Sequence, residues 1–274
     1  MTNASSASMA IANVLTIAGS DSGGGAGIQA DLKTFSALGA YGASVITALT
    51  AQNTRGVTAI HAPDRGFVTA QLDAVFDDIR IDAVKIGMLA NAPIARAVAD
   101  ALQRYRPRYI VLDTVMISKS NHALLSSDAV AAIRDVLLPL ATLVTPNLPE
   151  AAALLGETAV TDEAGMVRQG EALRALGAQA VLMKGGHLAS TDSPDWLIQD
   201  SGTLRLGGPR VPVKNTHGTG CTLSSAIAAL AAQRDDLAAA VTDAKTYLTG
   251  ALQASDRLDV GSGVGPVHHF YRWW

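Results

Sequence analysis

The residues best placed for chemistry lie at positions 215–222, where the sequence reads NTHGTGCT. Gly218 and Gly220 leave the backbone free to form an anion-binding nest at the start of a predicted helix. Cys221 falls in the first turn of that helix, where the helix dipole lowers the pKa of a thiol. A reactive thiol beside an anion site is one interpretation, and a small, inert, buried cysteine is the other.

A second glycine-rich segment, residues 19–27, follows an apolar run and opens another predicted helix. It lacks the Gly-Lys-Ser/Thr of a nucleotide-binding P-loop. Gly25, Gly27 and Ala30 match the dinucleotide pattern, but that pattern needs a ribose-binding acid about 20 residues further on. No acid occurs in residues 32–63, so we reject a dinucleotide site. A ligand-binding loop and a tight turn without a ligand both remain open.

Polar residues near this loop pose similar choices. Asp31 lies on the apolar face of the predicted helix, where a carboxylate is costly unless it is paired or bound. A structural ion pair and a substrate contact both explain it. Gln52 and Asn53 end the second predicted strand. They are either turn residues or amides that read the edge of a heterocycle by donating and accepting together.

Further candidates follow later strands. Asp113 ends an apolar strand and is expected to point into a ligand crevice. Asn147 and Glu150 form either a helix capping box or, for Glu150, part of a metal shell. Lys184 precedes two glycines and either binds a phosphate or lies in a solvated loop. The histidines without metal-ligand spacing are interpreted as structural or loop residues: His217, His268 and His269.

The elements that must position these residues alternate between strands and helices. Short apolar runs predict strands over residues 14–18, 43–49, 83–86, 109–113, 143–144 and 180–183. Longer patterns predict helices over residues 28–38, 67–79, 93–104, 129–137, 166–176, 222–232 and 237–254. Short segments at residues 196–199, 203–206 and 210–213 indicate a hairpin at one sheet edge. This alternation predicts an α/β fold with a mostly parallel, doubly wound sheet covered on both faces.

Composition limits the class of protein. The 274 residues include 24 acids and 21 bases, a net charge of −3, without the basic patch of a nucleic-acid or membrane-surface partner. One cysteine excludes an internal disulfide framework and favours the reducing cytoplasm. Residues 34–54 are uncharged, but polar residues interrupt them, so we reject a membrane span. We expect a disordered tail over residues 1–12 and one domain over residues 13–274.

Taken together, the motifs resemble the hydroxymethylpyrimidine/phosphomethylpyrimidine kinases of thiamine biosynthesis, within the ribokinase-like superfamily. The resemblance covers residues 14–274 and is specific because the motifs occur as an ordered set. They are GSDxxxGAGIQAD at 19–31, KIGML at 85–89, DxVM at 113–116, TPNxxE at 145–150, KGGH at 184–187 and HGTGCT at 217–222.

This resemblance implies a three-layer αβα domain, a homodimer, and the use of ATP and Mg²⁺. The enzyme would phosphorylate the hydroxymethyl group of the pyrimidine and then the resulting monophosphate. The implied pyrimidine-binding residues are Gln52 and Asp31, with Gly19 and Met88 lining the pocket. The implied Mg²⁺ residues are Asp113 and Glu150, and the implied nucleotide-phosphate residues are Asn147, Lys184, Thr216 and Thr219. Catalysis would use Lys184, the nest at Gly218 and Gly220, and Cys221 as the base.

Three departures from the family pattern stand out. Ser22-Gly23 replaces Pro-Ser/Thr after Asp21, Thr114 replaces a proline, and Asn121 replaces a glycine. Two alternatives to the pyrimidine kinase remain open. One is a pyridoxal or pyridoxine kinase on the same fold, because those substrates also carry a hydroxymethyl group on an aromatic ring. The other is a sensor that binds the pyrimidine without turnover.

Overall fold

A nine-stranded, mostly parallel sheet forms the centre of the protein, with strand order β3-β2-β1-β4-β5-β6-β7-β8-β9. The computed structural model describes residues 10–116 and 126–274. The strands are β1 (Asn13–Asp21), β2 (Tyr41–Asn53), β3 (Gly56–His61), β4 (Ala83–Ile86), β5 (Tyr109–Leu112), β6 (Leu143–Val144), β7 (Ala180–Lys184), β8 (Asp195–Gln199) and β9 (Gly202–Leu206). Antiparallel pairs occur only toward the two edges, at β2–β3, β7–β8 and β8–β9.

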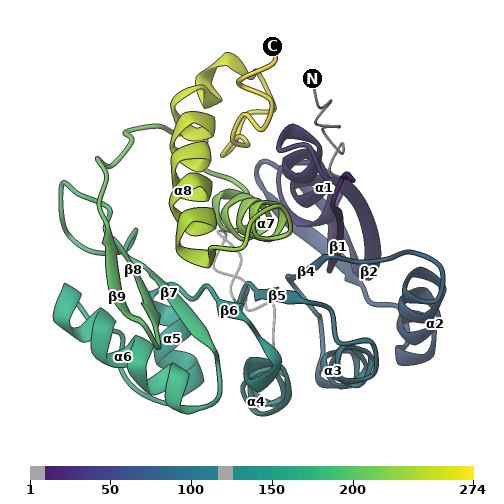
Figure 1. Cartoon of the computed structure of the whole chain (residues 1–274). Coiled ribbons are helices and arrows are strands. Elements are labelled where there is room, and N and C mark those ends of the chain that lie inside the picture. Colours follow the sequence, from purple (N-terminus) through teal and green to yellow (C-terminus); the bar gives the residue numbers. More distant parts are fainter. Residues whose placement is uncertain (1–9, 117–125) are drawn as a thin grey trace, which may run out of the picture.

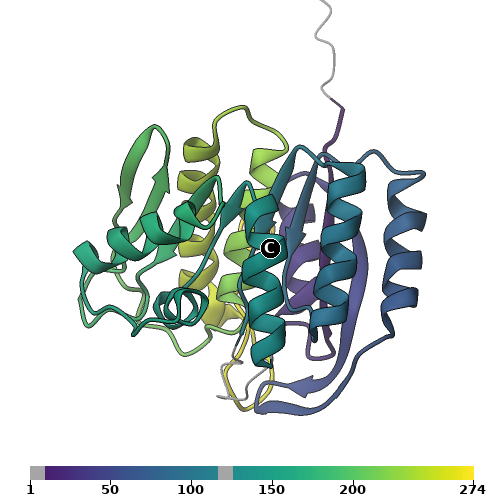
Figure 2. The ribbon, with the colours of Figure 1, turned by 90° about the horizontal axis from the view of Figure 1, so that it is seen from below.

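Helices cover both faces of the sheet, as Figure 1 shows. They are α1 (Gly27–Ala37), α2 (Arg65–Phe76), α3 (Ala92–Tyr105), α4 (Ser127–Ala132), α5 (Leu148–Leu155), α6 (Glu163–Ala175), α7 (Thr219–Ala231) and α8 (Leu237–Gln253). The layer α2–α6 packs on one face, and α2, α3 and α4 lie side by side in Figure 2. The helices α1, α7 and α8 pack on the other face. Two separate apolar clusters fill the two interlayer spaces, which confirms the predicted three-layer αβα fold.

The central strands have the burial expected of a parallel sheet covered on both sides. All four residues of β4 are buried, and both residues of β6 are fully buried. Such strands read as continuous apolar runs rather than as alternating patterns. The sequence therefore predicts the bounds of β4 and β6 correctly. The one charged residue in these two strands is Lys85, which needs a buried partner.

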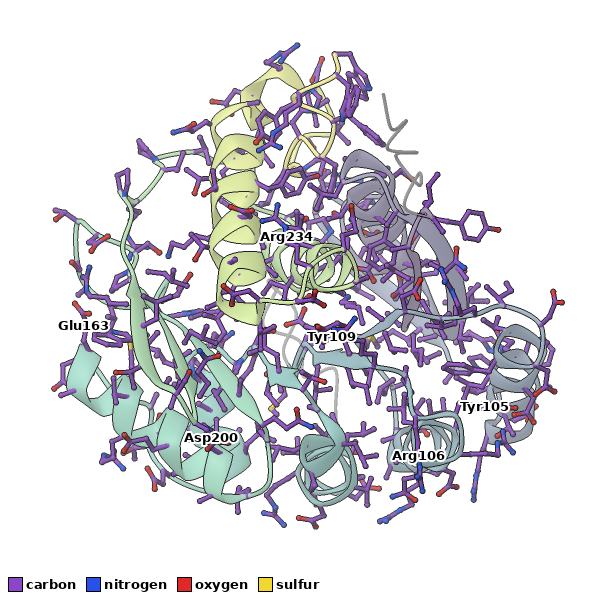
Figure 3. All side chains as sticks on the ribbon, in the orientation of Figure 1. Tyr105, Arg106, Tyr109, Glu163, Asp200 and Arg234 are labelled. Atoms are coloured by element: carbon purple, nitrogen blue, oxygen red, sulfur yellow. The ribbon has the colours of Figure 1, made fainter. Side chains whose placement is uncertain are left out.

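The predicted edge hairpin is present as β8 and β9 at one end of the sheet. Helix α6 is tied to it through Glu163, the first residue of that helix, labelled in Figure 3. The Glu163 carboxylate accepts hydrogen bonds from Trp196 Nε1 at 2.8 Å and Arg205 Nε at 2.7 Å. These contacts hold the hairpin against the helical layer.

Two predictions about elements are wrong, and two elements were not predicted. Residues 210–213 form no strand, because Pro212 lacks an N–H and Arg210 donates to the carbonyls of Gly186, Leu188 and Ser190 instead. The edge strand β3 and the helix α5 were not predicted. Residues 129–137, predicted as one helix, form α4 followed by a π-helical turn over Ile133–Leu137.

Two segments named above lie mostly or wholly outside the described residues. The predicted tail 1–12 lies mostly outside the described residues, but Ala12 is buried and its carbonyl accepts a hydrogen bond from Tyr41 N. Asn121 also lies outside the described residues. Within the described part of the chain, no helix combines the length and the apolar character needed to cross a membrane.

Candidate active site

A cavity of about 650 Å³ opens where the carboxyl ends of the parallel strands meet. Its walls come from the ends of β1, β2, β4, β5, β6 and β7 and from the start of α7. The structure brings these predicted site residues together around it: Gly19, Gln52, Met88, Asp113, Asn147, Glu150, Lys184, Thr216, Gly218, Thr219, Gly220 and Cys221. Of the predicted site residues, Asp31 alone does not line the cavity.

Asp31 is fully buried beneath the cavity, and its carboxylate is used internally. Lys85 Nζ lies 2.8 Å from both carboxylate oxygens, and the hydroxyls of Thr16 and Ser225 each donate to it at 2.6 Å. Burial lowers the pKa of Lys85, but Asp31, Cys221 and Asp113 outweigh that effect and raise it. The structural ion pair, and not the pyrimidine contact, therefore accounts for Asp31. Its partner, Lys85, lies on β4, and the spacing of the two residues in the sequence does not indicate that they meet.

A compact charged cluster lies at one end of the cavity. Lys184 Nζ is 3.3 Å from Asp113 Oδ1 and 3.8 Å from Glu150 Oε2. Burial raises the pKa of Glu150; the Lys184 ammonium opposes this rise, and the Asp113 carboxylate adds to it. Burial by itself lowers the pKa of Lys184, yet the two carboxylates raise it overall, so the lysine stays charged. Two acids sharing one lysine favour the binding of a further cation.

The donor set of this cluster fits Mg²⁺. Proteins often hold Mg²⁺ by one or two carboxylates while substrate phosphates and water complete the octahedron. Asp113 and Glu150 supply two carboxylates, and Ser224 Oγ donates to Asp113 Oδ2 at 3.2 Å. Among the described residues, no group of three or more His, Cys, Asp or Glu side chains is arranged around a metal position.

Glu150 also caps a helix. Asn147 Oδ1 accepts from Glu150 N at 2.9 Å, and Glu150 Oε2 accepts from Asn147 N at 2.8 Å, which completes the capping box at the start of α5. The same oxygen accepts from Thr114 Oγ1 at 3.0 Å. The two interpretations of Glu150 are thus compatible, because the cap fixes the carboxylate at the edge of the cavity. Thr114, a departure from the family pattern, makes a contact that proline cannot.

The two glycines of the predicted nest, Gly218 and Gly220, lie at the N-terminus of α7. Gly218 has φ of 79°, and a Cβ there would clash with the carbonyl oxygen of Gly25. A Cβ on Gly220 would lie 3.7 Å from both Lys184 Nζ and Asp113 Oδ2. The start of α7 therefore lies next to the charged cluster. Thr219 Oγ1 donates to Thr216 O at 2.6 Å and fixes the turn that precedes the helix.

The structure corrects the predicted acidity of Cys221. The thiol is partly exposed at the cavity, but burial raises its pKa to about 11. Lys85 and a backbone N–H from Gly27 lower the pKa, whereas the carboxylates of Asp31 and Asp113 raise it further. Desolvation and the two carboxylates therefore outweigh the groups that lower the pKa, and the free enzyme carries a thiol at neutral pH.

Gln52, Gly19 and Met88 line the other end of the cavity. Gln52 N donates to Ser22 Oγ at 2.8 Å, and Ser22 Oγ donates to Gln52 O at the same distance, which fixes the end of β2. A Cβ on Gly19 would lie 3.4 Å from Met88 Sδ. A flexible apolar side chain together with an amide in the cavity wall suits the binding of a flat heterocycle.

His217 is the main site residue that the sequence interpretation missed. It lines the cavity, and its Nε2 lies 2.8 Å from Asp21 Oδ2 and 3.3 Å from Gln52 Nε2. Its place beside the glycines of the nest was the available signal. The structural interpretation does fit the other two histidines. His268 is buried, and His269 Nε2 lies 3.0 Å from Thr222 Oγ1, with its pKa lowered by burial to about 3.

The chain is similar to known proteins over nearly its whole length. The family model described as phosphomethylpyrimidine kinase matches residues 21–268. The hydroxymethylpyrimidine/phosphomethylpyrimidine kinase of Escherichia coli K12 is 59% identical over 262 residues, covering 96% of this chain and 98% of the relative.

Two solved structures have the same fold. The phosphomethylpyrimidine kinase of Clostridium difficile 630 has a TM-score of 0.78 and 45% identity, covering 87% of this chain and 98% of that chain. The pyridoxal kinase of Bacillus subtilis in complex with ADP has a TM-score of 0.89 and 34% identity, covering 97% and 100%. With this fold, these matches and this site, the chain belongs to the phosphomethylpyrimidine kinase family.

Proposed function

We propose that this protein transfers the γ-phosphoryl group of ATP to the hydroxymethyl group of 4-amino-5-hydroxymethyl-2-methylpyrimidine, and then phosphorylates the monophosphate. One observation supports this most strongly. A single cavity is lined by the Gln52 amide and Met88 together with Lys184, Asp113 and the glycines at the start of α7. The names of the family and of its relatives supply the substrate.

Each group in the cavity has a task in that reaction. Lys184 and the N–H groups at Gly218 and Gly220 stabilise negative charge on the phosphoryl group during transfer. Asn147, Thr216 and Thr219 contact the nucleotide phosphates. Asp113 and Glu150 hold Mg²⁺, which when bound neutralises part of the phosphate charge. Cys221, in the small fraction of molecules that carry its thiolate, accepts the proton of the substrate hydroxyl as that oxygen attacks phosphorus.

The pyrimidine lies between Gly19, Met88 and Gln52 in this proposal. Its hydroxymethyl group points toward Cys221 and Lys184, because these are the groups that act on the hydroxyl and on the transferring phosphoryl group in this proposal. Met88 covers the ring, and the Gln52 amide pairs with the ring edge. Positioning of this kind accounts for much of the catalysis in phosphoryl transfer, since the protein forms no covalent intermediate.

The assembly and location are also proposed from the family resemblance. We expect a cytoplasmic homodimer with the single domain formed by residues 13–274. The exposed apolar side chains of Tyr41, Leu49 and Ile60 lie on β2 and β3 at one sheet edge and offer a surface for a second copy. Light scattering on the purified protein measures the oligomeric state directly.

A coupled ATP assay tests the function. Rates of ADP formation are compared for the hydroxymethylpyrimidine, its monophosphate, pyridoxal and pyridoxine. We expect turnover of both pyrimidines, with a higher kcat/KM than for either pyridine. A higher kcat/KM for pyridoxal would favour the pyridoxal kinase alternative. Pyrimidine binding without ADP formation would favour the sensor.

A further inference from the structure

A hydrogen-bond network surrounds the side-chain amide of Gln52. On one side, His217 Nε2 lies 3.3 Å from Gln52 Nε2 and 2.8 Å from Asp21 Oδ2. On the other side, Thr50 Oγ1 lies 3.1 Å from Gln52 Oε1 and 2.9 Å from the carbonyl oxygen of Ser20. The amide nitrogen thus faces an imidazole nitrogen, and the single hydroxyl hydrogen of Thr50 faces two acceptors.

The position of the imidazole proton follows from Asp21. Its carboxylate already accepts hydrogen bonds from the backbone N–H groups of Gly23, Gly25 and Ala26 at 2.8–3.1 Å. Burial raises the pKa of Asp21, but the His217 hydrogen bond and these N–H groups outweigh it and lower the pKa below its usual value. An ionised carboxylate only accepts hydrogen bonds. His217 Nε2 must therefore carry a hydrogen to bond Asp21 at 2.8 Å.

That hydrogen conflicts with an amide nitrogen placed beside it. Two N–H donors would face each other between Gln52 and His217, and two acceptors would compete for the one hydrogen of Thr50. A half-turn of the carboxamide about the Cγ–Cδ bond removes the contact between two donors and leaves the Thr50 hydrogen to Ser20 alone. The turned amide fits the same space, because its oxygen and nitrogen have nearly the same shape. Oε1 then shares the His217 Nε2–H with Asp21 Oδ2, Nε2 donates to Thr50, and Thr50 donates to Ser20.

We propose that His217 is a positioning residue that holds the Gln52 amide with Oε1 toward the imidazole and Nε2 toward Thr50. This amide then selects a heteroaromatic ring that has an amino group beside an acceptor nitrogen. The network uses the two outer positions of the carboxamide, so one oxygen lone pair and one N–H remain for the cavity. His217 thereby fixes which atom of the amide meets which atom of the ligand.

The consequence for specificity rests on the proposed function. The hydroxymethyl group must point toward Cys221 and Lys184, so the ring cannot turn over to match a reversed amide. In a 4-aminopyrimidine the amino group donates to Oε1 of Gln52, and the adjacent ring nitrogen accepts from Nε2. A 4-oxo ring has the opposite pattern, a carbonyl beside an N–H, and meets two mismatches. With His217 removed, the amide is free to turn and accept the 4-oxo ring.

Steady-state kinetics on the two rings test this inference. We compare kcat/KM for 4-amino-5-hydroxymethyl-2-methylpyrimidine and for its 4-oxo counterpart in the wild type, His217→Phe, Gln52→Leu and the double variant. Phenylalanine keeps the ring but removes the N–H. The amino-to-oxo ratio should fall by about tenfold or more in His217→Phe, the scale of one unmade buried hydrogen bond. In the Gln52→Leu background the same change should have no further effect on the ratio, because His217 acts through Gln52.

Controls separate positioning from a general loss of structure. His61→Phe changes an exposed histidine on β3 and should leave the ratio as in the wild type. If His217→Phe does not fold, Thr50→Val removes the acceptor at the opposite end of the amide and should also lower the ratio. An unchanged ratio in a folded His217→Phe variant overturns the inference. If that variant does not fold, an unchanged ratio in Thr50→Val overturns it. An equal fall of the amino-to-oxo ratio when His217→Phe is made in the wild type and in the Gln52→Leu background overturns it as well.

The same data distinguish the inference from the proposed function. A wild type that phosphorylates neither ring refutes the proposed function and this inference with it. A wild type that prefers the amino ring, combined with a His217 variant of unchanged preference, refutes only the role of His217.

Discussion

Burial in the folded protein gives the Cys221 thiol a higher pKa than the sequence predicts, and this pKa can be measured without turnover. Burial raises this pKa to about 11, so about one molecule in 10⁴ carries the thiolate at pH 7. The helix N-terminus alone would have placed the pKa below its usual value. The two accounts therefore predict different pH profiles for the reaction of the thiol.

Alkylation by iodoacetamide reports the thiolate fraction, and Cys221 is the single cysteine of the chain. We expect the rate, followed by intact mass, to rise about tenfold per pH unit from pH 7 to pH 9 without levelling. ATP and the pyrimidine together should slow the reaction by covering the thiol. A rate that levels below pH 8 would refute the argument that desolvation outweighs the helix dipole.

Substitutions of Cys221 test whether its thiol acts in catalysis. If Cys221 is the base, Cys221→Ala and Cys221→Ser should bind both substrates but lose about 10²–10⁴-fold in single-turnover rate. The wild-type rate should climb between pH 7.5 and pH 9.5. Cys221→Asp should retain activity with a flatter profile, because a carboxylate is already ionised over that range. A Cys221→Ser enzyme with the wild-type rate would show that the thiol is only a packing residue.

Four further perturbations test the remaining assignments. Gln52→Leu should raise KM for the pyrimidine while KM for ATP stays nearly constant; an unchanged pyrimidine KM would remove Gln52 from the site. Lys184→Ala should lower kcat more than it changes either KM, because its charge acts on the transferring phosphoryl group, and full activity would return Lys184 to a structural role. Lys85→Met should destabilise the fold by about 3–5 kcal/mol in urea titrations, because it leaves the fully buried Asp31 unpaired, and a smaller loss would mean that Asp31 is satisfied without Lys85. The pKa of His269 is about 3 in the folded state, below its unfolded value, so stability present above pH 6.5 should fall by about 2 kcal/mol on going to pH 5; a His269→Gln variant should lose less over the same range in thermal unfolding.

The strand–helix alternation is the part of the fold that the sequence determined best. The bounds of β4 and β6 are correct because each is a short apolar run buried on both faces, and local pattern reports such burial directly. The edge strand β3 was missed since its outward residues are exposed and its pairing depends on β2. Helix α5 was missed although its cap, Asn147, was identified.

The sequence also determined part of the candidate site and left part of it open. Lys184 could be selected from the sequence because it ends a strand of the parallel sheet, at the ligand edge, and Gly218 and Gly220 could be selected because they begin a helix. Their convergence on one cavity follows from that topology. What the sequence left open was which neighbour each polar side chain would meet.

Only the tertiary structure decided those neighbours. Asp31 could have been a ligand or half of an ion pair until β4 brought Lys85 to it from 54 positions along the chain. His217 had no assigned partner until the start of α7 placed it against Asp21 and Gln52. The pKa of Cys221 changed direction once burial and two carboxylates were added. Hydrogen bonding and desolvation depend on distances between residues far apart in the chain, and folding sets those distances.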